Sequence, residues 1–500
     1  VPGMIIIHCR DGTHDWEVYH RSVGAANNLH INKTDAFTTD LTVWNNTTPT
    51  SSVFTVGTSS NVNQNGHGYV AYVFAHDEQS FGTDSDEAII KCGSFVIGSG
   101  AVSDVDLGFE PQFVLTKLTT TTGSWLLSDV MRGAADTQYN YLLANSSNAE
   151  GTLTGGNFYP TSTGFHYESL GGAGNTVVYM AIRRPHKPPT AATEVFNPIN
   201  DVGSSSSRKI TAGNLVDLVI NKSKANGAYG WYWLDRLRGA TALVSNSTAA
   251  ESTSQVASTT FDEMNGIYVS ATDGWTYASP YGGPYAKYFL TRTPGFFDVV
   301  AYTGTGSLSG VNHNLGVTPQ LKIIKSRSDS YAWIVGGSAL LGENGYTYLN
   351  TNAGVSDFTN YWDGGDDSAT QFSVRNDNNF SDSAGKTYVA YLFATLDGIS
   401  KVGTYTGTGS NINVDCGFTA GARFVVIKRA DIGDSGNWYV WDSVSGIVSG
   451  NDPYLRFNAS HSQTTNTDYI DPLNAGFTVT SSAPADLNAS GGNYLFLAIA

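Results

Sequence analysis

The 500-residue chain is poor in cysteine, in charge and in long apolar runs. Its three cysteines, Cys9, Cys92 and Cys416, are too scattered for a disulfide framework, so packing has to supply the stability. Charged residues make up 14% of the chain and leave a net charge of −16, which disfavours nucleic acid and anionic lipid as partners. No eighteen-residue apolar run is present, so we expect no membrane insertion, and no signal-peptide pattern follows Val1.

Helical periodicity and the short motifs of catalysis are also missing. No window of about a dozen residues repeats apolar positions at the helical spacing. The chain lacks a phosphate-binding loop followed by a helix, a His-Glu-x-x-His zinc motif and a Gly-x-Ser-x-Gly nucleophile motif. We therefore predict no enzyme, with no catalytic, cofactor-binding or metal-ligating residue and no cofactor.

Glycine, aromatic residues and short apolar runs are abundant instead. The chain has 55 Gly and 12% aromatics, with Ser, Thr and Asn between apolar runs of four to seven residues. This composition is typical of many short strands joined by turns, so the sequence predicts an all-β protein.

Several landmarks recur in the same order at intervals of about 100 residues. A Trp followed after eight or nine residues by Gly occurs five times, and the tryptophans lie 109, 106, 102 and 105 residues apart. An apolar run ending in Lys precedes the last four of them, and His8 takes the place of this Lys in the first copy. The tryptophans are Trp16, Trp125, Trp231, Trp333 and Trp438.

Two further strings keep the same register. A Leu-x-x-Asn motif follows each Trp, and the string at residues 302–307 returns unchanged at 405–410. Independent markers at one period indicate an internal repeat. The sequence thus predicts a tandem array of five β-sandwich domains of about 100 residues each, at residues 1–87, 88–190, 191–295, 296–398 and 399–500.

The first and third copies depart from the others. The first lacks the opening strand that Ile89–Ile97 supplies in the second, so we expect the 500 residues to be a window of a longer polypeptide. In the third, Gly282, Gly283 and Pro284 precede the closing strand, which predicts an edge strand or a bulge there. Three prolines within residues 183–190 predict a stiff spacer between the second and third copies.

The repeated Trp has two interpretations. It is a core residue if its strand faces inward, as the apolar residue two positions later indicates at Val18, Leu127 and Val440. It is a sugar-stacking platform if it lies on the surface. The alternation favours the core, and each copy then carries enough buried aromatic surface to fold alone.

Two clusters hold residue types that bind metals. His8, Cys9, His14 and Asp15 lie close together in the first copy, but His8 replaces a repeated Lys and Asp15 precedes the core Trp.

The second cluster is rich in oxygen ligands and is the place where calcium is possible. No spacing in it matches the twelve-residue calcium loop, so solvated turns are the prediction. Its members are Asp363, Asp366, Asp367, Asn376, Asn379 and Asp382.

The pattern of these landmarks resembles an uncharacterised β-sandwich repeat of phage virion proteins, especially of marine and cyanobacterial phages. The residues that carry it are the Lys-ending strand, residues 438–446, the Leu-x-x-Asn motif, Gly476–Val479 and Tyr388–Phe393. The resemblance implies a tail fibre, a head fibre or a similar appendage. It supplies no catalytic residue.

Two functions of different class follow. The first is a structural and adhesive segment of a virion appendage on the virion surface, a rigid spacer whose loops touch the host or neighbouring subunits. Its partners are other virion subunits, as a homo-oligomer, and a host surface glycan or protein. The alternative is a bacterial extracellular adhesin or carbohydrate-binding array. A glycan depolymerase is a third hypothesis, and it requires a cleft with two facing carboxylates.

Overall fold

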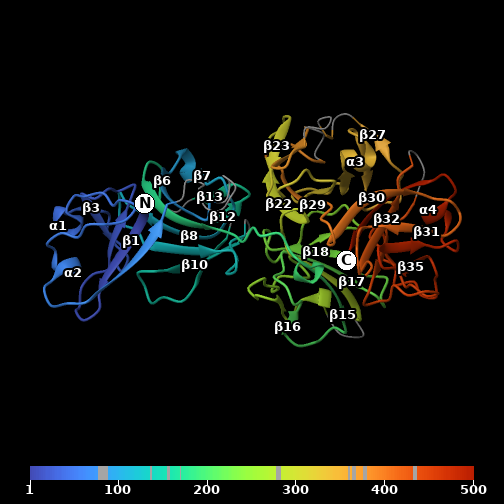
Figure 1. Cartoon of the computed structure of the whole chain (residues 1–500), viewed down its shortest axis with the longest axis horizontal. Helices are drawn as coiled ribbons and strands as arrows, with labels where there is room; N and C mark the ends of the chain where they lie inside the picture. Colours follow the sequence, from blue (N-terminus) through green and yellow to red (C-terminus); the bar gives the residue numbers. More distant parts are fainter. Residues whose placement is uncertain are drawn as a thin grey trace. The chain divides into compact units, whose positions relative to one another are not determined.

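The computed structural model describes residues 1–76, 88–135, 138–154, 158–168, 171–276, 283–358, 361–362, 367–375, 380–431 and 436–500 (Figure 1). The chain forms two compact units, Val1–Pro185 and His186–Ala500. Their boundary falls inside the proline-rich spacer expected at residues 183–190. Residues 77–87, which end the first predicted copy, lie outside the described residues.

The protein is all-β, as predicted, and every strand pair of its sheets is antiparallel. Its α-helices are single turns of four residues: α1 (Leu41–Trp44), α2 (Ser60–Asn63), α3 (Ser338–Leu341) and α4 (Ala485–Asn488). Short 3₁₀ turns lie at Ser99–Ala101, Ala192–Glu194 and Gly274–Thr276. None of the helices in the described part of the chain could cross a membrane.

The first unit contains two large sheets. The first large sheet has the order β4 (Thr38–Thr39), β3 (Asn27–His30), β2 (Glu17–His20), β1 (Pro2–Cys9) and β5 (Tyr69–Ala75). The second has the order β11 (Gly151–Thr154), β10 (Gln138–Leu143), β9 (Trp125–Asp129), β8 (Pro111–Leu118), β14 (Thr176–Arg183) and β6 (Ile90–Val96). A small sheet of β12 (Phe158–Thr161), β13 (Gly164–Glu168) and β7 (Val102–Asp106) accompanies the second large sheet.

The first large sheet ends at β5, whereas the second continues past its closing strand β14 to β6. The described part of the first copy therefore has no counterpart of β6, as the sequence predicts. Its β5 is partly or fully exposed along its whole length, while the corresponding strand β14 is mostly buried. A missing neighbour explains this difference, because an edge strand keeps its outer side in solvent.

The second unit contains three large sheets with one common strand order. The third large sheet is β15 (Phe196–Asp201), β21 (Tyr285–Leu290), β17 (Leu218–Ser223), β18 (Tyr232–Asp235) and β19 (Leu243–Val244). The fourth is β22 (Phe297–Thr303), β29 (Thr387–Phe393), β24 (Leu321–Ser326), β25 (Ile334–Gly336), β26 (Gly345–Tyr348) and β27 (Ser356–Asp357). The fifth is β30 (Ser400–Thr406), β37 (Asn493–Ile499), β32 (Phe424–Arg429), β33 (Tyr439–Asp442) and β34 (Leu455–Arg456).

A small sheet belongs to each of these three large sheets. The small sheets are β16 (Arg208–Thr211) with β20 (Gly266–Val269), β23 (Ser309–Asn312) with β28 (Gln371–Val374), and β31 (Ile412–Asp415) with β36 (Gly476–Val479) and β35 (Ile470–Leu473). Apolar side chains of a large sheet and its small sheet enclose a separate core in each case.

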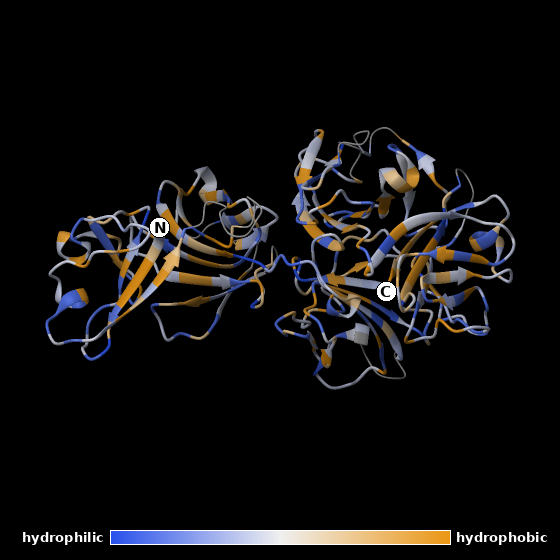
Figure 2. Ribbon diagram, in the orientation of Figure 1, coloured by the Kyte–Doolittle hydropathy of each residue, from blue (hydrophilic) through white to orange (hydrophobic). Residues whose placement is uncertain are grey.

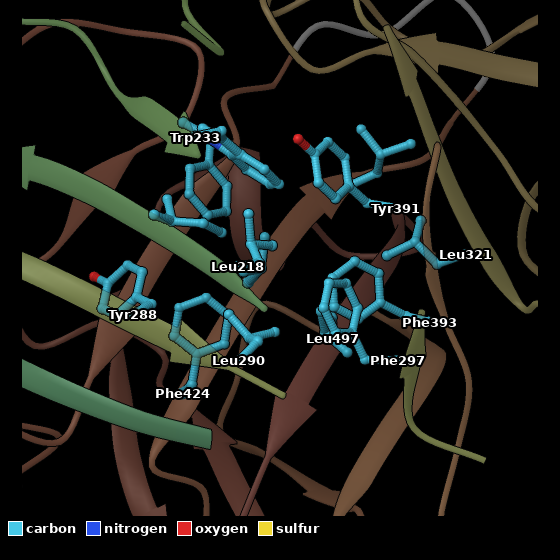
Figure 3. Close-up of a cluster of buried hydrophobic side chains, with 14 of the residues drawn as sticks. Leu218, Trp233, Tyr288, Leu290, Phe297, Leu321, Tyr391, Phe393, Phe424 and Leu497 are labelled. Atoms are coloured by element: carbon cyan, nitrogen blue, oxygen red, sulfur yellow. The ribbon is translucent and has the colours of Figure 1, made fainter. Parts of the chain in front are cut away.

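The large sheets of the second unit place apolar side chains in a core on each face, which explains why their strands read as continuous apolar runs. Figure 2 shows these strands as mostly hydrophobic. On β29, Tyr388 and Ala390 point into the core shared with the small sheet. Tyr391 and Phe393 point the other way, into a core to which the third, fourth and fifth large sheets all contribute (Figure 3). We call this the common core. It encloses an apolar cavity of about 30 Å³.

The common core changes the expected organisation. The sequence predicts five domains that each fold alone, but residues 186–500 form one compact unit with shared hydrophobic packing. A count of five separate domains is therefore not confirmed.

The closing strand of the third copy also differs from its prediction. β21 is no edge strand, because it lies between β15 and β17. It begins at Tyr285, directly after Pro284, so the proline removes no hydrogen bond from the ladder.

Candidate functional site

The repeated tryptophans connect one large sheet to the next. In the second unit, Trp333 Nε1 donates to the Val244 carbonyl of the third sheet at 3.1 Å, and Trp438 Nε1 donates to the Tyr348 carbonyl of the fourth at 3.0 Å. Trp231 Nε1 of the third sheet donates to a carbonyl of the fifth, at Arg456, at 2.6 Å. The three bonds form a closed cycle, so each sheet both gives and receives one indole.

Among its described residues, the first unit contains one such contact. Trp125 Nε1 of the second large sheet donates to the His30 carbonyl of the first at 2.8 Å. His20 lies across the same boundary, where its Nε2–H donates to the Tyr179 carbonyl at 3.0 Å and its Nδ1 accepts from the Ser22 N–H. Burial lowers the pKa of His20 to about 4. The first and second large sheets are thus joined by an indole hydrogen bond, as neighbouring large sheets are in the second unit.

An Asn side chain positions each repeated Trp, and in four of the five copies it is the Asn of the Leu-x-x-Asn motif, a role that its turn preference does not reveal. The Asn side-chain oxygen accepts the Trp backbone N–H in every copy. In the fourth copy the motif is Leu349-x-x-Asn352, but the residue that accepts the Trp333 N–H is Asn350. The motif is misplaced by two residues in this copy, because Thr347 holds the strand position of the motif Leu while Leu349 also precedes an Asn by three residues.

A buried polar network reinforces the boundary between the third and fourth sheets. Asp235 and Arg238 are fully buried and paired at 2.6 Å. The Tyr391 hydroxyl of the fourth sheet donates to Asp235 at 2.9 Å and accepts from Arg238 at 3.0 Å. Asp235 lies four residues after Trp231, and Asp442, four residues after Trp438, accepts the Tyr288 hydroxyl in the same way at 2.9 Å. Sequence alone does not reveal these pairs because their partners lie about 150 residues apart.

The repeated Lys closes the loop ahead of the Trp. Lys325 Nζ donates to the carbonyls of Ser326 and Asp329 at 2.6 and 3.0 Å. Lys428 Nζ reaches the Ala353 carbonyl of the fourth copy at 2.7 Å, so it also crosses a boundary. Burial lowers the pKa of both ammonium groups to about 8.

On one side of the first unit, the residues of such a boundary meet no further large sheet among the described residues of that unit. Trp16 is half-buried and stacks on His8 with ring centroids 4.1 Å apart, whereas the other four repeated tryptophans are buried. Tyr72 occupies the strand position of Tyr391 and is 47% exposed. On the second sheet, Leu127 and Leu142 are half-buried, although Val440 and Leu455, at the same positions of the fifth sheet, are buried. We call Trp16, Tyr72, Leu127 and Leu142 the open side of the first unit.

The four residues of metal-binding type in the first copy do not come together at one site. His8 stacks on Trp16, Asp15 binds Lys33 at 2.6 Å, and His14 Nδ1 contacts Asn61 Oδ1 at 3.2 Å. Cys9 instead meets two residues that the spacing did not select, Asp11 and His67, with ligand atoms within 4.8 Å of one another. His67 is remote in sequence, and only the pairing of β1 with β5 brings it to Cys9.

The oxygen-rich cluster of the fourth copy is described in part. Asp367 accepts from Lys322 Nζ at 2.6 Å, and both side chains are buried. Asp382 accepts from Ser309 Oγ at 2.8 Å and from the Thr305 N–H. These two carboxylates have protein partners. The other four members, Asp363, Asp366, Asn376 and Asn379, lie outside the described residues.

Together these features define an all-β protein in which large sheets pack side by side through tryptophan, tyrosine and aspartate contacts. The chain belongs to the family described as "Domain of unknown function (DUF7483)", whose model matches residues 1–185 and 290–500. The unmatched interval covers most of the third large sheet, the copy that departs most from the others in sequence. No curated protein and no solved structure matches the chain.

Proposed function

We propose that the chain is a structural segment of a phage virion appendage, such as a tail or head fibre, built from five β-sandwich modules. The module boundaries are those of the sequence repeat. The appendage setting rests on the resemblance of the repeat to phage virion proteins. In this role the modules act as a rigid, extracellular scaffold whose loops contact the host surface or neighbouring subunits.

The observation that carries the proposal is the common core of the second unit. Modules that share a hydrophobic core and a cycle of indole hydrogen bonds cannot pivot on their joints as beads on a string do. Such a unit transmits force and holds its loops in fixed positions, which a fibre requires and which a flexible adhesin array does not.

The open side of the first unit supports an assembly role. In the second unit, a third module covers the positions that Trp16, Tyr72 and Leu142 occupy in the first. We propose that a further module of the same fold, from outside residues 1–185, binds there. The occupant must contact both modules of the first unit, so both of its own flanks must be free. A module of a second copy of the first unit does not meet this requirement, because its partner module already covers one flank.

The chemistry of this occupant can be specified. Its Trp would donate to the Leu143 carbonyl, the counterpart of the Val244 carbonyl that accepts Trp333. An Asp four residues after that Trp would accept the Tyr72 hydroxyl, as Asp235 accepts Tyr391. The second module itself has this Asp, at Asp129.

The test extends the full chain at Val1 with a second copy of residues 88–185, joined through a second copy of residues 77–87. Acrylamide quenching of Trp16 is measured as the difference between this chain and its Trp16→Phe variant. We expect the quenching constant to fall to that of a buried indole. The matched control carries Leu127→Asp and Leu142→Asp in the added copy only and should leave Trp16 accessible.

A folded, protease-resistant added module that leaves Trp16 as accessible as before refutes module packing at the open side. The virion setting is tested separately by mass spectrometry of virions purified from a phage whose genome encodes the chain. Peptides of this chain should be present in virions, and their absence there contradicts the appendage role.

A further inference from the structure

Three side chains with metal-binding atoms converge at one end of the first large sheet. Cys9 is the last residue of β1, Asp11 follows in the turn, and His67 lies just before β5. The antiparallel pairing of β1 with β5 sets Cys9 opposite Tyr69, and the Arg10 N–H donates to the Gly68 carbonyl at 2.8 Å. The ladder itself therefore holds the three residues together.

Their distances match the edges of a metal tetrahedron. Cys9 Sγ lies 3.3 Å from Asp11 Oδ1 and 3.8 Å from His67 Nδ1, and the Asp11 and His67 atoms are 3.0 Å apart. Zinc bonds of about 2.0–2.3 Å to oxygen, nitrogen and sulfur require ligand atoms roughly 3.3–3.8 Å apart in a tetrahedron. A shift of a few tenths of an ångström separates the observed trio from that geometry.

We propose that Cys9, Asp11 and His67 form a binding site for a zinc-type divalent ion. The thiolate selects zinc over calcium or magnesium, which prefer oxygen ligands only. The Cys9 thiol gives up its proton to solvent when the metal binds, so a thiolate and a carboxylate together balance the two positive charges. A water molecule takes the fourth position on the solvent side, where the Asp11 side chain is 53% exposed.

The Asp11 carboxylate is held in position and in its charged form by hydrogen bonds. The Gly68 backbone N–H donates to both Asp11 oxygens, and with Cys9 and His67 it lowers the pKa of Asp11 to about 2. Asp11 is thus ionised at neutral pH. The bound ion would tie the β1 turn to the start of β5, the strand that forms the exposed edge of this sheet.

The test is a Co²⁺ titration of the full chain at neutral pH after treatment with a chelator and a reductant. We expect one equivalent of Co²⁺ to bind with tetrahedral visible bands and a thiolate-to-cobalt charge-transfer band, and Zn²⁺ to displace it. Because Cys92 and Cys416 are also buried and free, a Cys9→Ser chain checks the origin of the band.

Asp11→Asn and His67→Gln should each weaken Co²⁺ binding at least tenfold. The matched control is His166→Gln, which removes a histidine that contacts Asp104 at 2.7 Å in a histidine–carboxylate pair. This control should bind Co²⁺ like the parent chain. Absence of the charge-transfer band in a chain with native circular dichroism, or equal affinity of the parent and His67→Gln chains, overturns the site.

Discussion

Truncation of Trp333 should weaken the whole second unit rather than one copy of the repeat. The indole is fully buried in the common core and packs against Trp233, with ring centroids 5.3 Å apart. Removing a buried Trp side chain costs about 3–5 kcal/mol. The lost indole hydrogen bond adds only about 1 kcal/mol, because the Val244 carbonyl keeps its bond from the Ser247 N–H.

Hydrogen exchange followed by mass spectrometry can locate this loss in the Trp333→Ala chain. Amides that exchange only through opening of the unit should speed up by about a thousandfold for a loss of 4 kcal/mol. The acceleration should be equal in β17, β29 and β32, since these strands belong to different large sheets but to one core.

The matched variant is Trp16→Ala in the first unit. Its half-buried indole should cost roughly 1–2 kcal/mol, and strands of the second unit should keep their protection. Faster exchange confined to the fourth sheet in Trp333→Ala, with β17 and β32 unchanged, refutes the cooperative common core.

Three further predictions concern single contacts. Tyr391→Phe should lower the free energy of unfolding of the second unit by about 1–3 kcal/mol, because Asp235 loses a buried donor; an unchanged urea midpoint contradicts this. Val426→Ile should raise it by up to about 0.7 kcal/mol by filling the 30 Å³ cavity that Val426 lines, and a lower melting temperature would instead indicate overpacking. Burial lowers the pKa of His20 from 6.5 to about 4, so the first unit should keep its stability above pH 6.5 and lose roughly 3 kcal/mol as the pH falls to 4; urea titrations of the parent and His20→Gln chains measure the difference.

The sequence predicts the strands well because their pattern is local. The apolar run of β29 shows two apolar faces, and the structure accordingly buries it between neighbours. The pattern cannot say what covers each face, however. Tyr391 and Leu392 look alike in sequence, yet one enters the common core and the other a core closed by a small sheet.

Long-range pairing limits the prediction of the candidate sites more severely. His14 is near Cys9 in sequence but directs Nδ1 to Asn61, whereas His67 reaches Cys9 from 58 residues away. The core position predicted for the repeated tryptophans is confirmed for Trp125, Trp231, Trp333 and Trp438, whereas Trp16 is half-buried. An indole that donates to a different copy has no signature in its own copy. Only the strand order and the closure of the second unit determine these partners.

The cyclic indole contacts make the burial of the repeated tryptophans depend on the number of copies that pack together. In a ring of three copies every repeated Trp is covered by a neighbouring sheet, whereas two copies leave one Trp partly exposed, as at Trp16. Excision of one copy from the second unit would break two of its three indole hydrogen bonds and expose the apolar side chains that the excised sheet covers.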